Sequence, residues 1–280
     1  MNAYITVDEM KRRGVMDIKR SDSDLDLLRR IVAQSRRADG ITLRFFFMLE
    51  QTKKFTGDGS HILDLWDDLI SIDTDGLKTD DNQDRTFEIT WATTDYLLFP
   101  SNAAPDTRLN PRSQPFDQIQ ADISAGTKAA FPAGMDAIQN AGEWGYWKHT
   151  RTATETVSGS HDDIVTVLTV NTRVDVEQGA TILIGSEQMF VESYSDKDLN
   201  VIRGVNGSTA ASLSGGEAIS IFEYPAEVVD AVQIMVRRDH ANAQANYANV
   251  SGLADGQFQT FGGLSRDARD LLQPFKRYVV

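Results

Sequence analysis

The period at which apolar residues recur changes twice along this chain of 280 residues, and each change marks a change of secondary structure. Between residues 24 and 37 apolar side chains follow one another at three- and four-residue steps, which predicts an amphipathic helix. After Lys53 apolar and polar residues alternate, which predicts β-strands. The helical period returns after Pro225, a residue that fits the first turn of a helix, with Val228 and Val232 on one side. The sequence therefore predicts an α+β fold in which β-structure interrupts a small helical core.

Residues 1–50 form the N-terminal part of this expected core. Thr6, followed three residues later by Glu9, is a capping-box pattern, and Gly14 is typical of a helix C-terminus, so a short helix is expected between them. Residues 41–50, with three consecutive phenylalanines, are expected to lie across the apolar stripe of the helix over 24–37.

Residues 51–150 have the pattern of a β meander with a long proline-rich loop. A turn is expected at residues 56–60, followed by two strands, one on each side of Asp67-Asp68, and an aromatic-rich strand pair is expected over 137–147. Four prolines fall between residues 100 and 115, so a long loop is expected over 100–130, and loops of that length are usually functional or ordered by a partner. The strands expected in this part lie at residues 62–66, 69–73, 87–91, 96–99 and 116–123.

Residues 155–223 have the pattern of an inserted small β domain. Short strands separated by Gly- and Asp-rich turns predict a small barrel or sandwich. A returning core helix is expected over 224–245, and residues 246–280 are expected to form a linker and an extended C-terminal tail, with a mostly polar segment over 241–257. The strands expected in the small domain lie at residues 164–170, 181–184, 189–192, 199–202 and 218–222.

The charge of the chain argues against binding nucleic acid by neutralising phosphates. Its 41 acidic residues outnumber its 28 basic ones, which gives a net charge of −13, whereas such binding depends on clustered Lys and Arg. The acidity is compatible with a surface past which DNA slides, and equally with a role in solubility alone. The N-terminus lacks the apolar stretch of an export signal and no segment has the length of a membrane span, so a protein that is neither exported nor membrane-bound is expected.

No residue pattern indicates catalysis, a metal or a cofactor, and none of the three is expected. Cysteine is absent, and the four histidines are too scattered for a zinc site. The acidic run over residues 73–84 lacks the offsets of an EF-hand loop and is interpreted as a solvated loop. Neither phosphate-binding glycine motifs nor a GxSxG elbow is present. A pair of catalytic carboxylates stays open, because a sequence gives no distance between acidic residues.

The tryptophans allow two interpretations. Aromatic side chains on alternating strands are most often core residues, which is the favoured reading here. They could instead form a platform on which a sugar stacks. The residues concerned are Trp66, Trp91, Trp144, Tyr146 and Trp147.

Six short segments follow one another in a characteristic order. They are Tyr4–Lys11, Leu27–Ile31, Arg44–Phe46, Phe55–Leu65, Tyr96–Pro100, and Gly142–Tyr146 after Phe131-Pro132. This order resembles the head-to-tail connector (adaptor) family of long-tailed bacteriophages. Tyr224-Pro225 before the valine-rich helix and the ending Leu271–Arg277 also match the layout of that family. The matches span most of the chain, with residues 100–130 and 241–256 poorly covered.

Two further segments, Ile184–Val191 and Leu199–Ala210, are similar to a small β domain that is common in phage structural proteins. They are the most specific stretch of the resemblance. The chain departs from the usual pattern at Leu213-Ser214-Gly215, where that domain frequently has a histidine before the glycine.

The resemblance implies a virion protein with a mechanical role. It implies a non-enzymatic subunit of a twelve-fold ring beneath the portal protein, which extends the DNA channel and presents a surface to the next neck or tail protein. Its partners would be the portal, further copies of itself and that next protein, while genomic DNA passes through the lumen without specific binding. The resemblance places the protein at the portal vertex of the virion, after assembly in the host cytoplasm.

The C-terminal tail is the predicted portal-binding site. Its apolar side chains are expected to bury against the portal, and its basic ones to pair with acidic groups there. A last helix that packs on its own domain is the competing interpretation. The predicted portal-binding residues are Leu264, Leu271, Leu272, Phe275, Lys276, Arg277 and Tyr278.

Two other functions remain open at this point. One is a β-rich carbohydrate- or receptor-binding module of a virion, which would use exposed aromatic side chains. The other is a stopper or tail-completion protein, one tier lower in the neck.

Overall fold

The computed structural model describes residues 2–13, 23–106, 114–244, 250–252, 258–260 and 264–277. It confirms an α+β fold, mostly β, with two antiparallel sheets and four α-helices in the described residues. The chain divides into two compact units. Unit 1 comprises Met1–Phe45 and Thr150–Val280, and unit 2 comprises Phe46–His149.

The two N-terminal helices begin where the sequence predicts. Helix α1 spans Val7–Arg12, and the hydroxyl of its N-cap Thr6 accepts a hydrogen bond from the backbone N–H of Glu9 at 3.1 Å. Helix α2 spans Asp24–Thr42 and is therefore five residues longer than the helix expected over 24–37. It ends where Leu43 adopts a left-handed conformation with φ of 55°.

The expectation that residues 41–50 lie across the stripe of α2 is wrong. The first two of these residues complete α2, and strand β1 begins at Leu49. Phe46 is fully buried in unit 2, where its ring lies 5.4 Å from that of Tyr146. Phe46 therefore packs beside Tyr146 in unit 2 and not on the apolar stripe of α2.

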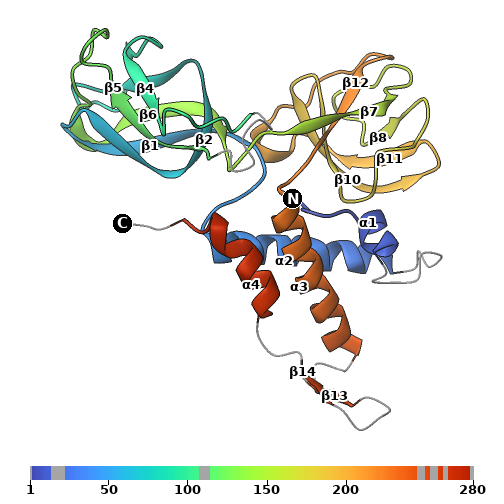
Figure 1. The fold of residues 1–280 in the computed structure, drawn as a ribbon. Coiled ribbons are helices and arrows are strands. Elements are labelled where there is room, and N and C mark those ends of the chain that lie inside the picture. The colour runs from blue at the N-terminus through green and yellow to red at the C-terminus, as the bar shows by residue number, and fades with distance from the viewer. Residues whose placement is uncertain are drawn as a thin grey trace. The chain divides into compact units, whose positions relative to one another are not determined.

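The late helices of unit 1 pack on α2 (Figure 1). Helix α3 spans Ala226–Gln244 directly after Pro225, and α4 spans Arg266–Leu272 with a 3-10 turn η2 at Gln273–Phe275. Helix α3 contacts both α2 and α4. Within the polar segment expected over 241–257, α3 continues to Gln244 and strand β13 (Val250–Gly252) pairs with β14 (Phe258–Thr260).

Unit 2 contains a six-stranded antiparallel sheet. Its strand order is β1-β6-β2-β5-β4, with β3 paired to β2. The bounds are β1 Leu49–Asp58, β2 Ile62–Thr79, β3 Ile89–Thr90, β4 Tyr96–Phe99, β5 Phe116–Ala121 and β6 Ala133–Trp144. Strands β4 and β5 confirm the expected strands at 96–99 and 116–123.

Three expectations in unit 2 are wrong. The two strands expected on either side of Asp67-Asp68 are one, because β2 runs through these residues as a single strand of 18 residues. The Asp68 carbonyl accepts the Gly145 N–H at 2.8 Å there, which keeps the chain in the sheet. Residues 137–147 form most of the single strand β6 and its end, not a strand pair, since β6 lies between β1 and β2 along its length. The strand expected at 87–91 is reduced to the two residues of β3.

Unit 1 contains the second six-stranded antiparallel sheet, with order β7-β12-β9-β10-β11-β8. The outermost strands of this order meet at a bridge between Val157 and Val170. Strands at 181–184, 189–192, 199–202 and 218–222 are confirmed, whereas the one expected at 164–170 begins only at Val167 and β7 was not expected. The bounds are β7 Thr150–Thr156, β8 Val167–Thr169, β9 Thr181–Ile184, β10 Glu187–Ser195, β11 Asp198–Ile202 and β12 Ala218–Phe222.

This second sheet encloses its own apolar core. Val170, Val176, Ile182, Met189 and Leu199 are among the side chains that are wholly removed from solvent there. Burial alternates along β8 and β11, as the pleat of a strand predicts, whereas β10 begins with five consecutive buried residues, Glu187–Val191. In the part of the chain that the structure describes, no helix is both long and apolar enough to cross a membrane.

Candidate functional site

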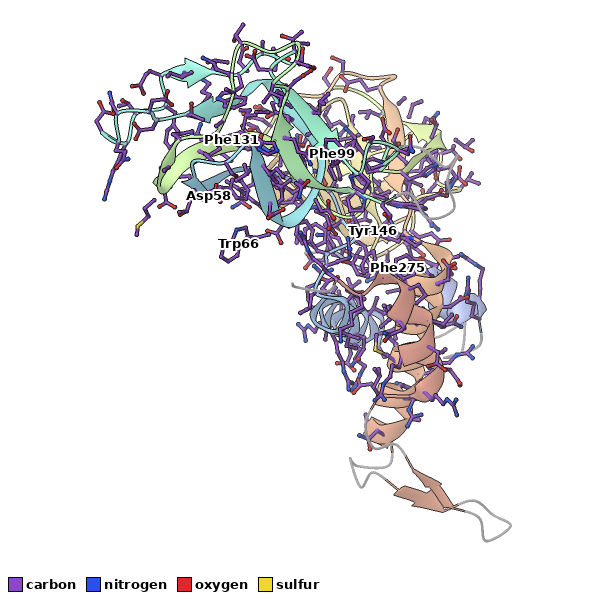
Figure 2. The ribbon with its side chains drawn as sticks, turned by 60° about the vertical axis from the view of Figure 1, so that its left-hand side comes forward. Asp58, Trp66, Phe99, Phe131, Tyr146 and Phe275 are labelled. Atoms are coloured by element: carbon purple, nitrogen blue, oxygen red, sulfur yellow. The ribbon has the colours of Figure 1, made fainter. Side chains whose placement is uncertain are left out.

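The predicted portal-binding residues lie on and after α4. Leu272 and Phe275 are buried, with 0% and 7% of their surface exposed, while Leu264 and Leu271 are half-buried. Helix α4 contacts α3 and α2, so Leu272 and Phe275 pack within unit 1 (Figure 2 labels Phe275). This packing is the competing interpretation of the tail that the sequence left open.

The basic end of the tail lies nearer the surface. Lys276 is exposed, and Arg277 is half-buried with its backbone N–H donating to the Thr42 carbonyl at 2.8 Å. Tyr278 lies outside the described residues. The structure thus joins Arg277, near the end of the tail, to the end of α2. Among the described residues, Lys276 is the most accessible of the predicted contacts.

Strand β10 and the loop after β11 are held together by a buried ion pair. The guanidinium of Arg203 contacts both carboxylate oxygens of Glu187, at 2.7 Å and 2.6 Å, and Glu187 is wholly buried. The same guanidinium donates to the carbonyls of Asp162, Val165 and Ala211 at 2.9, 3.0 and 2.6 Å. The carbonyls of Asp162 and Val165 therefore bind Arg203 and not a neighbouring strand, in keeping with the later start of β8 at Val167.

Glu187 is also an acceptor for the backbone. The N–H groups of Gly204 and Ala211 each donate to its carboxylate at 3.0 Å. Burial by itself raises the pKa of Glu187, but Arg203 and the two N–H groups outweigh burial and place that pKa below its usual range. The motif is therefore a structural anchor of three loops.

Helix α1 docks on the second sheet through polar contacts. The Val7 N–H donates to the Gln178 carbonyl at 2.9 Å, and the Tyr194 hydroxyl donates to Asp8 at 2.7 Å. The Thr6 hydroxyl donates to Glu177 in addition. Burial, aided by the hydrogen bond to Asp8, raises the pKa of Tyr194 to about 12.

A half-open cavity of about 420 Å³ lies beside this contact. Its lining carries both signs of charge, but these charges pair with one another or with neighbours. Lys11 contacts Asp24 at 2.5 Å, and Arg12 contacts Glu177 at 2.5 Å. The lining is thus balanced in charge and selects neither an anion nor a cation. It consists of Asp8, Lys11, Arg12, Asp24, Leu25, Gln178, Ser193 and Tyr194.

The tryptophans divide between the two interpretations. Trp91, Trp144 and Tyr146 are 3%, 0% and 5% exposed, which confirms the core reading, and Trp147 is half-buried. The core reading is wrong for Trp66, whose side chain is 83% exposed. Figure 2 shows the Trp66 indole projecting away from the sheet of unit 2.

Trp66 belongs to one face of the paired strands β2, β5 and β4, which we call the Trp66 face. Along β2, Leu63 and Leu65 are buried and Asp64 and Trp66 are exposed. Asp64 lies opposite Gln118, and Gln118 opposite Phe99, so their side chains share that exposed side. The amide of Gln118 donates to Asp64 at 2.7 Å, and that of Gln120 to Gln118. The face consists of Ile62, Asp64, Trp66, Leu97, Phe99, Gln118 and Gln120.

Sequence reasoning missed this face, although a signal for it exists. Trp66 stands two residues after Asp64, and in a strand two residues apart share a side. Trp66 therefore shares the side of the strand with the carboxylate of Asp64, opposite to the side of Leu63 and Leu65, and that side is the polar one.

The acidic run contains one cluster of carboxylates. Oxygens of Asp80, Asp84 and Glu88 lie within 4.8 Å of one another, the only cluster of three such groups in the described residues. Asp80 is buried and accepts the backbone N–H groups of Asp84 and Arg85 at 3.2 Å and 2.7 Å. The expectation of a solvated loop over 73–84 holds for the exposed Asp81 and Asp84. It is wrong for residues 73–79, which belong to strand β2, and for Asp80, whose carboxylate ties the turn together.

Neither a protein-family model, nor a curated protein, nor a solved structure matches this chain. A proposal about its function therefore rests on the surfaces and residues of this chain alone.

Proposed function

We propose that this chain is a structural, non-enzymatic subunit of the neck of a tailed-bacteriophage virion. As a head-to-tail adaptor it forms a ring, twelve-fold by resemblance to that family, beneath the portal protein. The ring extends the DNA channel and presents the surface to which the next neck or tail protein attaches.

One observation carries this proposal. Helices α2, α3 and α4 come from three distant parts of the sequence and pack together in unit 1. The two six-stranded sheets lie in the sequence between α2 and α3. This arrangement supports a helical core with β insertions, the layout that the sequence shares with the adaptor family.

The second sheet has its own apolar core, and a bridge from Val157 to Val170 joins its two ends. Both observations support the proposal that residues 155–223 are an inserted small barrel. The Glu187–Arg203 pair would fix the loops of that barrel in a ring under mechanical load.

The proposed portal contact is the C-terminal tail. Lys276 and Arg277 would pair with acidic portal groups, with Leu264, Leu271 and Tyr278 beside them. Leu272 and Phe275 would anchor α4 to unit 1, since both are buried there. They would reach a portal only if α4 left α3.

The acidity of the chain fits a channel past which DNA moves. Unit 2 contains 17 of the 41 acidic residues and 8 of the 28 basic ones, so it carries −9 of the net charge of −13. Such a surface repels phosphates and offers them no binding site.

The test is direct. The purified protein is mixed with heads that carry the portal but lack neck proteins, and the portal vertex is imaged by cryo-electron microscopy. A symmetric ring under the portal is expected, with the tail against it, whereas a bare portal would contradict the proposal. Gel-shift assays at physiological salt should show no specific DNA complex.

The Trp66 face supports a second candidate function, glycan binding by a virion module. An exposed indole beside two amides and a carboxylate can stack on a sugar and bond to its hydroxyls. A glycan array tests this candidate, with loss of binding expected for Trp66→Ala. The buried Trp144 cannot serve as the stacking residue.

A position one tier lower, as a stopper or tail-completion protein, is a variant of the first proposal. Cryo-electron microscopy of heads with and without the adaptor of the same phage separates the two tiers.

A further inference from the structure

Helix α2 has an exposed side that is both apolar and basic, which we call the α2 face. Leu25 and Leu43, at its two ends, are 53% and 52% exposed. Arg29 and Arg37 lie between them and are exposed as well. Large apolar side chains left in solvent next to positive charge are typical of an interface. The face consists of Leu25, Arg29, Ala33, Arg37, Gly40 and Leu43.

The arginines of α2 fall into two groups. Arg30 pairs with Asp239 at 2.7 Å, and Arg36 pairs with Asp39 at 3.2 Å, so both serve unit 1 itself. Arg29 and Arg37 have no ion-pair partner among the described residues. The two guanidinium groups on the α2 face are thus available to another molecule.

Small residues separate these arginines. Ala33 and Gly40 are exposed, and a Cβ added at Gly40 would meet no atom within 4 Å. A partner surface can therefore approach the backbone of α2 closely between the two arginines.

The Trp66 face has the complementary character. Its one charged side chain is the carboxylate of Asp64, and its segments 62–66, 96–99 and 116–121 contain no lysine or arginine. It belongs to the unit that carries −9 of the net charge. Its exposed apolar side chains are Trp66, at 83%, and Leu97, at 48%.

We propose that the α2 face of one copy of this chain docks on the Trp66 face of a second copy. Arg29 or Arg37 would lie over the Trp66 indole as a cation–π pair and reach Asp64, while Leu25 or Leu43 would cover Leu97. The occupant is a second copy because one chain presents both complementary surfaces.

The contact is heterologous, since it joins two different surfaces. In a pair, the first copy would keep its Trp66 face free and the second its α2 face, so the same contact repeats until a ring closes. The closure into a ring rests on the proposed adaptor function, whereas the contact between two copies does not require a portal.

The absence of cysteine permits a clean test by cross-linking. Ala33→Cys marks the α2 face and Leu97→Cys marks the Trp66 face, and the two proteins are mixed and treated with a bismaleimide. A heterodimer is expected between these two variants. The matched control replaces Leu97→Cys with Val174→Cys, since Val174 is 64% exposed and lies on neither face. Equal yields with the two partners would overturn the proposal.

Charge reversal sharpens the result. Arg29→Glu with Arg37→Glu, added to the Ala33→Cys protein, should lower the heterodimer yield about tenfold, as expected for the loss of close charge pairs. Asp64→Lys in the Leu97→Cys protein should restore it in part. A heterodimer yield that stays the same after both charge reversals would count against the proposed contact.

The outcomes separate this inference from the proposed function. A ring under the portal that forms unchanged with the Arg29→Glu and Arg37→Glu protein would retain the adaptor function and overturn the contact. A specific heterodimer without any ring on heads would establish the contact and contradict the adaptor function. Loss of binding to the next neck or tail protein on Trp66→Ala, with the ring intact, would assign the Trp66 face to that protein and overturn the contact.

Discussion

The carboxylate of Glu187 and the guanidinium of Arg203 form a two-point ion pair inside unit 1, with Nε to Oε1 at 2.7 Å and Nη2 to Oε2 at 2.6 Å. The Glu187 side chain is 0% exposed and that of Arg203 is 8% exposed. The two residues lie on strand β10 and just after β11, which pair in the sheet. Arg203 extends the contact to three carbonyls, so removal of either partner leaves buried polar groups unsatisfied.

Glu187→Gln should therefore destabilise unit 1 strongly. An amide cannot neutralise the buried guanidinium, and breaking a buried pair from one side costs about 3–5 kcal/mol. Guanidinium chloride unfolding, followed by far-UV circular dichroism, measures the loss.

A matched control for that variant is Arg151→Ala. Arg151 pairs with Asp175 at 3.1 Å and Glu223 at 3.3 Å, but its side chain is 43% exposed. Exposed pairs contribute about 0–1 kcal/mol, so this variant should lose little stability. Equal losses for the two variants would show that Glu187 and Arg203 are no anchor.

Asp39 should make stability depend on pH. Burial raises its pKa from 3.8 to about 7, against the opposing effects of Arg36 and of the Tyr4 hydroxyl. The folded protein thus holds a proton on Asp39 that the unfolded chain releases above about pH 4. The contribution of Asp39 to the free energy of unfolding should therefore fall as the pH rises from about 4 to about 7.

Asp39→Asn removes this titration, because an amide carries no charge. The variant should gain stability relative to the wild type as the pH rises through that window, and the gain should level off above about pH 7. Urea unfolding of both proteins at pH 5 and pH 8 measures the difference. A constant difference between the two pH values would contradict the prediction.

Replacement of Trp144 should lower the stability of the protein far more than replacement of Trp66. Trp144 is fully buried, its indole N–H donates to the Gln51 carbonyl at 2.8 Å, and Lys53 lies 4.4 Å from its ring centroid. Trp144→Ala should cost about 3–5 kcal/mol, whereas Trp66→Ala should change stability by at most about 0.5 kcal/mol. Thermal unfolding monitored by near-UV circular dichroism compares the two.

Leu272 should stabilise unit 1 through α4. Leu272→Ala leaves a cavity between α4 and its neighbours and should cost about 2–5 kcal/mol. Lys276→Ala, at an exposed position, should leave stability unchanged but weaken attachment to portal-bearing heads. Differential scanning calorimetry and co-sedimentation with heads report the two effects. A stable Leu272→Ala protein would indicate that α4 detaches easily and would favour direct contact between Leu272 and the portal.

Several elements of this fold could be predicted because their signals are local. Thr6 caps α1 through the N–H of Glu9, three residues away, and Pro225 starts α3 with its fixed φ angle. The strands at 181–184 and 218–222 follow from alternation within four or five residues. Each of these features depends on neighbours in the sequence.

The candidate site depended on the pairing of distant segments. The Trp66 face forms only when residues 62–66, 96–99 and 116–121 lie side by side, and no local pattern specifies which strands pair. Phe46 could not be placed from sequence because its partner Tyr146 lies a hundred residues further on. The two strands expected around Asp67-Asp68 are one, and the Asp68 carbonyl there accepts a hydrogen bond from the N–H of Gly145, far along the chain.

The sequence by itself determined the α+β composition, the starts of α1, α2 and α3, most strands of the second sheet and the acidic balance of the chain. The tertiary structure decided which polar groups are buried with a partner, as for Glu187 and Asp80, and which aromatic side chain stays in solvent, as for Trp66. The physical reason is that capping and alternation act over a few residues. Burial is set instead by contacts between segments far apart in the chain, and these exist only once the chain has folded.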